Sequence, residues 1–210
     1  MKPSKNLKNL EQALAQAAKE KNQAKRGVKI AAIIAEALRT IGQDPILVGG
    51  AAVEFYTEGG YATRDIDMVS PGGKPLWDVM QSLGFKRKGK DFINTSLEIY
   101  IEFPGEILGN NRTSDLLDID GRHLKIISIE DLIIDRLCSY KFWKSEIDGI
   151  AALLLLEINT INNDRLKIQA QNNNCLDALE WMQKIYEEIF RKKMNKTSAS
   201  QLLHQWLYPK

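Results

Sequence analysis

A pair of glycines, Gly49-Gly50, stands between an apolar run and a helix-forming segment and constrains the fold more than any other feature. The run Ile46-Leu47-Val48 predicts a short strand, and the residues after the glycines predict a helix over 51–57. Glycine lacks a Cβ, so its backbone can turn sharply and approach a ligand closely. Because the N-terminus of a helix attracts anions, the segment predicts a phosphate-binding turn, although a glycine pair alone also forms ordinary tight turns.

Two aspartates, Asp65 and Asp67, belong to the next predicted strand, which runs from Thr63 to Val69. Carboxylates at i and i+2 of a strand point to the same face. Such a pair makes a hard oxygen site, which Mg²⁺ requires when it also keeps waters and substrate phosphates as ligands. Asp-x-Asp alone is also common at solvated strand ends. Together with the upstream glycines, it predicts phosphoryl chemistry on a nucleoside triphosphate.

A second acidic strand follows at 97–103, where apolar residues alternate with Glu98, Tyr100 and Glu102. We expect this strand to supply a third carboxylate, and periodicity alone does not separate Glu98 from Glu102. Arg64, next to the aspartates, could neutralise phosphate charge or pair with a neighbouring carboxylate.

The chain changes character along its length, from a basic N-terminal helix (1–27) to a mixed α/β region (28–127) and then a helical region (128–210). Lysine and arginine crowd the first thirty residues and 191–196, which fits contact with nucleic-acid phosphates or solvated helix faces. No apolar run approaches the roughly 20 residues of a membrane span. With a polar N-terminus and two cysteines outside any CxxC motif, we expect a cytoplasmic protein without membrane contact.

The glycine pair, the helix and Asp65-Ile66-Asp67 together resemble the nucleotidyltransferase fold of the DNA polymerase β-like superfamily. The chain is most similar to the bacterial minimal, AbiEii-like or related uncharacterised nucleotidyltransferases, through 101–104, 135–137 and 140–143. The resemblance covers 28–157. It implies an α+β fold, in which helices flank a mixed β-sheet and a C-terminal helical region follows.

The resemblance also implies roles for individual residues. Asp65 and Asp67 would bind the catalytic Mg²⁺ (or Mn²⁺) ions, and the similarity around Glu102-Phe103-Pro104 favours Glu102 as the third ligand, with Glu98 as the alternative. The nucleotide would contact the remaining candidates, which are Gly49, Gly50, Arg64, Lys141 and Lys144. Two positions depart from the family pattern: Gly50 stands where serine is common, and the third acid is glutamate rather than the commoner aspartate.

The expected reaction is the Mg²⁺-dependent transfer of a nucleoside monophosphate from an NTP to a hydroxyl group. The acceptor would be RNA, a protein or a small molecule, and the similarity to AbiEii-like proteins suggests a toxin–antitoxin or defence component. The alternative is a catalytically inactive module that acts by binding, as an antitoxin or as an RNA-binding partner.

Overall fold

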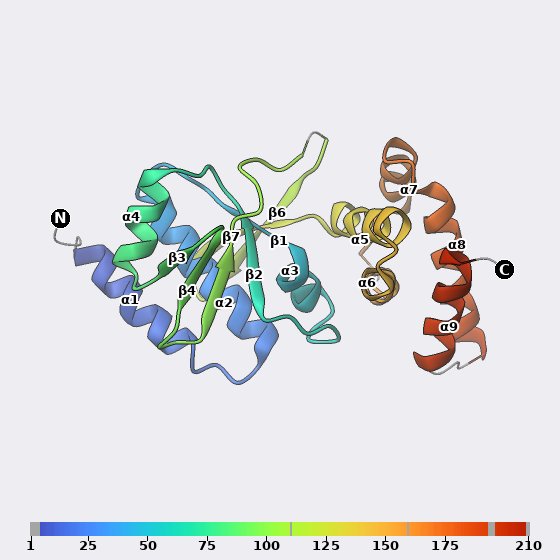
Figure 1. Ribbon diagram of the computed structural model, residues 1–210, viewed down its shortest axis with the longest axis horizontal. Coiled ribbons are helices and arrows are strands. Elements are labelled where there is room, and N and C mark those ends of the chain that lie inside the picture. Colours follow the sequence, from blue (N-terminus) through green and yellow to red (C-terminus); the bar gives the residue numbers. More distant parts are fainter. Residues whose placement is uncertain (1–4, 110, 159, 193–195, 209–210) are drawn as a thin grey trace. The chain divides into compact units, whose positions relative to one another are not determined.

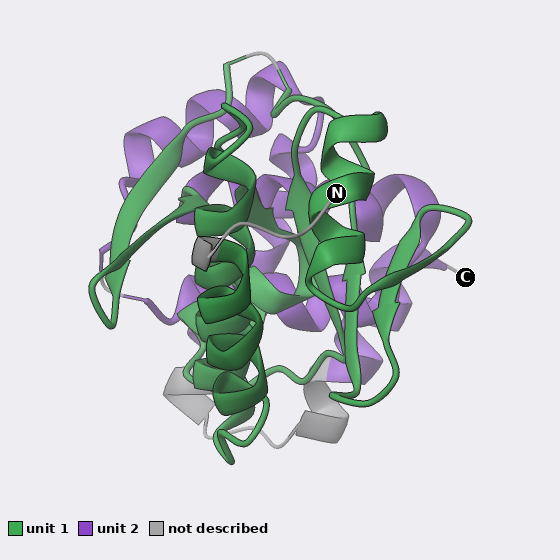
Figure 2. Cartoon of the chain, turned by 90° about the vertical axis from the view of Figure 1, so that its left-hand side faces the viewer, with its two compact units in different colours: residues 1–128 green, residues 129–210 purple. Residues whose placement is uncertain are grey.

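The computed structural model describes residues 5–109, 111–158, 160–192 and 196–208. The chain forms two compact units, Met1–Ser128 and Ile129–Lys210 (Figure 2). The first unit takes in the N-terminal helix together with the α/β region. No helix among the described residues is long and apolar enough to cross a membrane.

Unit 1 is built on a mixed sheet, which in the described part of the unit has seven strands in the order β3-β4-β5-β2-β1-β7-β6 (Figure 1). β1 lies antiparallel to β2 and parallel to β7, and β2 lies parallel to β5. This arrangement confirms the predicted α+β fold. The strands are β1 (Ile46–Val48), β2 (Asp65–Val69), β3 (Lys86–Lys88), β4 (Asp91–Asn94), β5 (Ile99–Glu102), β6 (Ser114–Ile119) and β7 (Arg122–Ile127).

Helix α2 is the main packing partner of this sheet and is buried along most of its length. The described part of the segment expected as one N-terminal helix (1–27) is not a single helix. The first helix ends at Ala17, and the Asn22 side chain caps the next one by accepting from the Lys25 N–H. Helices α1 and α4 both pack against α2. The helices of unit 1 are α1 (Lys5–Ala17), α2 (Gln23–Arg39), α3 (Gly49–Tyr56) and α4 (Lys74–Ser82).

The central strands divide their side chains between an apolar and a polar face. Phe92, Ile101 and Ile66 lie in register across β4, β5 and β2, and all three are buried. Successive residues of a strand point to opposite faces, so the residues on either side of this row lie on the other face of the sheet. That face carries Asp65 and Asp67. The hydrophobic row therefore fixes the direction in which the candidate acids point.

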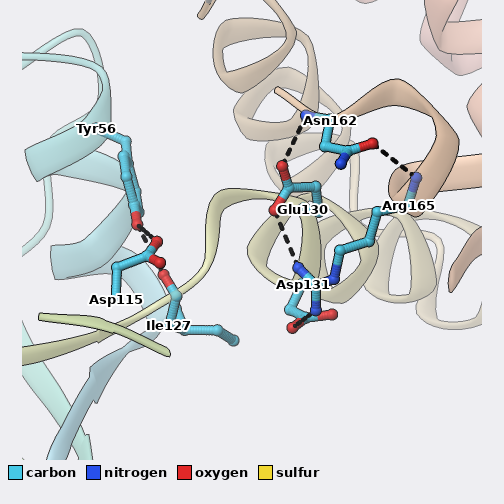
Figure 3. Close-up of polar contacts among 7 residues, drawn as sticks. All are labelled: Tyr56, Asp115, Ile127, Glu130, Asp131, Asn162 and Arg165. Atoms are coloured by element: carbon cyan, nitrogen blue, oxygen red, sulfur yellow. Dashed lines mark hydrogen bonds and ion pairs between the residues drawn. The ribbon is translucent and has the colours of Figure 1, made fainter. Parts of the chain in front are cut away.

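Unit 2 is helical, which confirms the predicted C-terminal helical region. Its α5 carries two buried acids, Glu130 and Asp131, and Arg165 pairs with both, at 3.0 and 2.6 Å (Figure 3). Asn162 caps α7 by accepting from the Arg165 N–H. The helices are α5 (Ile129–Trp143), α6 (Glu146–Leu156), α7 (Asn163–Asn172), α8 (Leu176–Lys192) and α9 (Lys196–Leu207).

Candidate functional site

Asp67 and Glu102 are direct neighbours on adjacent parallel strands. The register of β2 and β5 pairs Asp67 with Glu102 and Asp65 with Tyr100. Paired residues share a face of the sheet, and neighbouring strands lie about 4.8 Å apart. Asp67 and Glu102 are half-buried, whereas Asp65, at the start of β2, is exposed. The structure thus brings Asp65, Asp67 and Glu102 onto one polar face, with Asp67 between the other two.

Gly49 follows β1 directly and lies next to the polar face that carries the acids. Its φ is +64°, in the left-handed region that favours glycine, and a Cβ built on it would lie 2.1 Å from Asp67 Oδ2. The Asp67 carboxylate is therefore packed directly against the backbone where α3 begins. The residue before the helix is Val48, whose side chain gives no cap to the first N–H groups. These N–H groups give the start of α3 the partial positive charge that suits an anion.

Thr63 occupies the space beside Gly50. A Cβ on Gly50 would lie 2.8 Å from Thr63 Oγ1 and 3.0 Å from Thr63 Cβ. This contact gives a physical reason for glycine at position 50, because a larger side chain here would collide with the threonine. The Thr63 hydroxyl stands close to the place that a serine side chain would take.

Arg64 is held on the strand next to the aspartates. Its guanidinium donates to the Tyr100 hydroxyl and lies over the Tyr100 ring, 4.1 Å from the ring centroid. Tyr100 is the register partner of Asp65, so the arginine reaches the same pair of strands as the acids. The sequence left open whether Arg64 pairs with a neighbouring carboxylate. In the structure its guanidinium contacts Tyr100 instead.

Two residues beside the acids escaped the sequence reasoning. β4 pairs Asp91 with Glu102, so Asp91, Glu102 and Asp67 form one row across β4, β5 and β2. Lys90 precedes Asp91, and its Nζ lies 2.5 Å from Glu102 Oε1. The side chain of Lys90 is otherwise 69% exposed. Glu102 first, and then Asp91 and Asp67, raise the pKa of the Lys90 ammonium by attraction. The sequence did contain one signal for this hairpin, which is the turn residue Gly89 between two short polar strands.

Glu98 lies outside the strand that was predicted to carry it. β5 begins at Ile99, and Glu98 belongs to the preceding turn with a φ of +52°. The main-chain carbonyls of Leu97 and Glu98 accept hydrogen bonds from Arg26, at 3.0 and 3.1 Å. The predicted strand over 97–103 is therefore too long at both ends, and the register pairs Glu102, not Glu98, with Asp67.

Lys141 and Lys144 belong to unit 2, whereas the acids belong to unit 1. The Lys141 ammonium donates to the Asn174 carbonyl and to Asp177, both at 2.7 Å. Lys144 is exposed and has a φ of +58°. The structure uses Lys141 to tie α5 to the start of α8.

The oxygen donors on the polar face suit a hard divalent cation such as Mg²⁺ or Mn²⁺. Within the described ranges, no three acidic, histidine or cysteine side chains are close enough to hold a metal ion as they stand. In the row formed by Asp91, Glu102 and Asp67, each carboxylate has its neighbour on the adjacent strand. The contact between the Lys90 ammonium and Glu102 shows that this position accepts a positive charge. The residues present therefore fit a metal that is also held by substrate oxygens.

The fold defines the class of protein. A crystal structure of an antigenic nucleotidyltransferase-like protein from Paracoccidioides brasiliensis matches with a TM-score of 0.54 and 14% sequence identity, over 90% of this chain and 98% of that chain. Likeness at this identity shows a shared nucleotidyltransferase-like fold. The family model described as "nucleotidyltransferase of unknown function", DUF6036, matches residues 28–202, and the chain belongs to that family. A search of curated proteins found no match.

Proposed function

We propose that the protein is an Mg²⁺-dependent nucleotidyltransferase that moves a nucleoside monophosphate from an NTP to an acceptor hydroxyl group. The observation that carries the proposal is the in-register pair Asp67 and Glu102, with Asp67 packed against Gly49 at the start of α3. Carboxylates for a cation and helix N–H groups for a phosphate thus meet at one point. Within the superfamily, we place the chain beside the bacterial minimal and AbiEii-like enzymes.

Asp65, Asp67 and Glu102 would hold the metal, which neutralises the triphosphate and activates the hydroxyl when it is bound. The N–H groups at the start of α3 would hold phosphate oxygens, and Arg64 would add positive charge beside them. The acceptor oxygen forms a bond to the α-phosphorus as the bond from that phosphorus to the β-bridging oxygen breaks. Pyrophosphate leaves, and a carboxylate of the row takes the hydroxyl proton.

In this scheme the Lys90 side chain occupies one position without the metal and another when the metal is bound. In the structure its ammonium is held by Glu102. A divalent cation at Glu102 would displace the ammonium, because two positive groups cannot share one carboxylate without strong repulsion. The released lysine, on a side chain that is already 69% exposed, could then pair with a phosphate oxygen of the incoming NTP.

An RNA acceptor is favoured by the basic edge strand β3, which β4 separates from β5 and its Glu102. β3 consists of Lys86, Arg87 and Lys88, all exposed, and Lys90 follows in the turn. A run of cations on an edge strand attracts the phosphates of a nucleic acid. A protein or small-molecule acceptor is the other option, and a cytoplasmic toxin–antitoxin or defence role with a protein partner is the setting that we propose.

The test is transfer of label from α-³²P-labelled NTPs in the presence of Mg²⁺ or Mn²⁺, with RNA and protein acceptors supplied separately. We expect pyrophosphate release and a labelled acceptor with the wild type, and neither with the D65N/D67N variant. Asp78→Asn is the matched control, because Asp78 is an exposed aspartate that pairs with Lys74 on α4. Equal transfer by wild type and D65N/D67N would show that the acids are not the catalytic centre.

The second candidate is an inactive module that binds a nucleotide or RNA. Two observations favour it: glycine at position 50, where serine is common in the family, and the ion pair between Lys90 and Glu102. This candidate predicts that RNA or NTP binds to wild type and to D65N/D67N alike, and that no pyrophosphate is released with any acceptor.

A further inference from the structure

The two cysteines of the chain, Cys138 and Cys175, meet inside unit 2, whereas the candidate acids belong to unit 1. Cys138 lies on α5, and Cys175 directly precedes α8. Both are thiols, and their side chains are hydrogen-bonded to each other. A disulfide forms only between cysteines that the fold brings this close. The pair therefore has the placement that an internal crosslink requires.

A second contact between the same two segments holds the cysteines together. Lys141 lies one turn after Cys138, and residues at this spacing share a face of a helix. The Lys141 ammonium donates to the Asn174 carbonyl and to the Asp177 carboxylate, both at 2.7 Å. Asn174 and Asp177 stand on either side of Cys175 in the sequence. The face of α5 that carries Cys138 is thus fixed against the start of α8.

The two thiols differ in their access to solvent. Cys138 is half-buried, whereas Cys175 is 0% exposed. Contact with Cys138 first, and then burial, raise the pKa of the Cys175 thiol. The thiolate is the reactive form of cysteine, so Cys175 is a poor target for an oxidant by itself. An oxidant in solvent reaches Cys138 first.

We propose that Cys138 and Cys175 form a reversible disulfide, in which a peroxide oxidises Cys138 and Cys175 then resolves it. The Cys138 sulfur takes one oxygen from hydrogen peroxide and becomes a sulfenic acid, and one water is released. The Cys175 sulfur then attacks the Cys138 sulfur. The S–S bond forms as the S–OH bond breaks, and the hydroxyl leaves as water with the Cys175 proton. The two thiols lose two electrons, which the peroxide gains.

The disulfide fastens α5 to the start of α8 and encloses α6 and α7 in one covalent loop. A crosslink of this kind stabilises a fold mainly by restricting the unfolded chain. Thiols such as glutathione reverse it by exchange. The protein then has a reduced form, held at this point by the contacts of Lys141, and an oxidised form that is held covalently.

The test starts from the full chain, reduced and then treated with hydrogen peroxide in its folded state. After removal of the peroxide, the chain is unfolded in guanidinium with N-ethylmaleimide, and its intact mass is measured. We expect the mass of the reduced chain less two hydrogens, without alkylation, and full alkylation after treatment with dithiothreitol. Alkylation of both cysteines after peroxide treatment, or a dimer linked through Cys138, would overturn the proposal.

Single variants test the order of the two steps. Cys175→Ser should stop at the sulfenic acid of Cys138, which dimedone labels. Cys138→Ser should leave Cys175 a thiol under the same treatment, because that side chain is buried. Oxidation of C138S as fast as wild type, or no dimedone label in C175S, would show that Cys138 is not the thiol that reacts first.

Wild type alone provides a measurement that does not depend on the folding of a variant. In glutathione redox buffers, the disulfide should be at least about tenfold more stable in the folded chain than in the chain unfolded by guanidinium. This difference arises because the fold already holds the two thiols together. Equal stability in the two states, or lower stability in the folded state, would contradict the disulfide.

Discussion

Substitution of Gly49 by alanine should destabilise unit 1 and move Asp67. Two costs combine. A left-handed backbone costs a non-glycine residue about 1–2 kcal/mol, and an overpacked contact costs about 1–3 kcal/mol. The second cost applies because the new Cβ would lie 2.1 Å from Asp67 Oδ2, so the carboxylate must rotate away. We therefore expect a loss of about 2–5 kcal/mol, the sum of these ranges.

Substitutions at two other glycines serve as controls that separate the cost of the left-handed backbone from the cost of the overpacked contact. Gly42 has a φ of +78°, and a Cβ added there would meet no atom within 4 Å, so Gly42→Ala should carry only the backbone cost. Gly27 lies inside α2, also with open space around it, and Gly27→Ala should stabilise the protein by about 0.5–1 kcal/mol. The order of stability should be G27A, wild type, G42A and G49A.

Differential scanning calorimetry measures this order. At about 2–4 °C per kcal/mol for a chain of this size, G49A should melt roughly 4–20 °C below wild type, and G42A only a few degrees below. A second readout is Mg²⁺ binding, which should weaken in G49A and stay unchanged in G42A. If G49A melts at the same temperature as G42A and binds Mg²⁺ like wild type, the tight contact between Gly49 and Asp67 does not exist.

Three further perturbations follow from the buried and paired charges. Burial raises the pKa of Glu54 above 4.5, so its stabilising contribution is complete below about pH 4.5 and is lost as the pH rises through the folded-state pKa. E54Q should then unfold at higher denaturant than wild type at pH 7 but not at pH 4, and an advantage at both pH values would contradict this. Arg165→Met should cost about 3–5 kcal/mol in guanidinium unfolding, because Glu130 and Asp131 then share a buried site without the positive charge of Arg165; a loss below about 1 kcal/mol would contradict the network. Lys90→Met should tighten Mg²⁺ binding in calorimetry, since no ammonium then competes at Glu102; unchanged or weaker binding would argue against displacement.

The local parts of the site were predictable from the sequence. The strand before Gly49, the helix after it and the strand that carries Asp65 and Asp67 follow from apolar spacing and glycine chemistry, which act over a few residues. The sequence did not decide between Glu98 and Glu102, because both residues fit the same two-residue period of a strand. The turn that gives Glu98 a φ of +52° shortens the strand, and the register with β2 then places Glu102 beside Asp67.

Residues that depend on pairing between distant segments were missed. Lys90 and Asp91 reach Glu102 only because the hairpin of β3 and β4 lies on β5. Glu54 looked like an ordinary helix residue, and its burial depends on segments that are distant in the sequence, such as 18–26 and 97–98. Neither strand register nor burial of a single polar residue is encoded in local periodicity, so these contacts needed the three-dimensional structure.

The central claim is that Asp67, Glu102 and the start of α3 form one site for a metal and a triphosphate. A crystal structure with Mn²⁺ and a non-hydrolysable NTP analogue tests it most directly, because the anomalous signal of Mn²⁺ locates the ion. We predict an Mn²⁺ peak bound by Asp67 and Glu102, phosphate oxygens on the N–H groups at Gly49-Gly50, and Lys90 moved off Glu102. Mn²⁺ bound elsewhere, or a nucleotide that leaves these acids without a metal, would contradict the account.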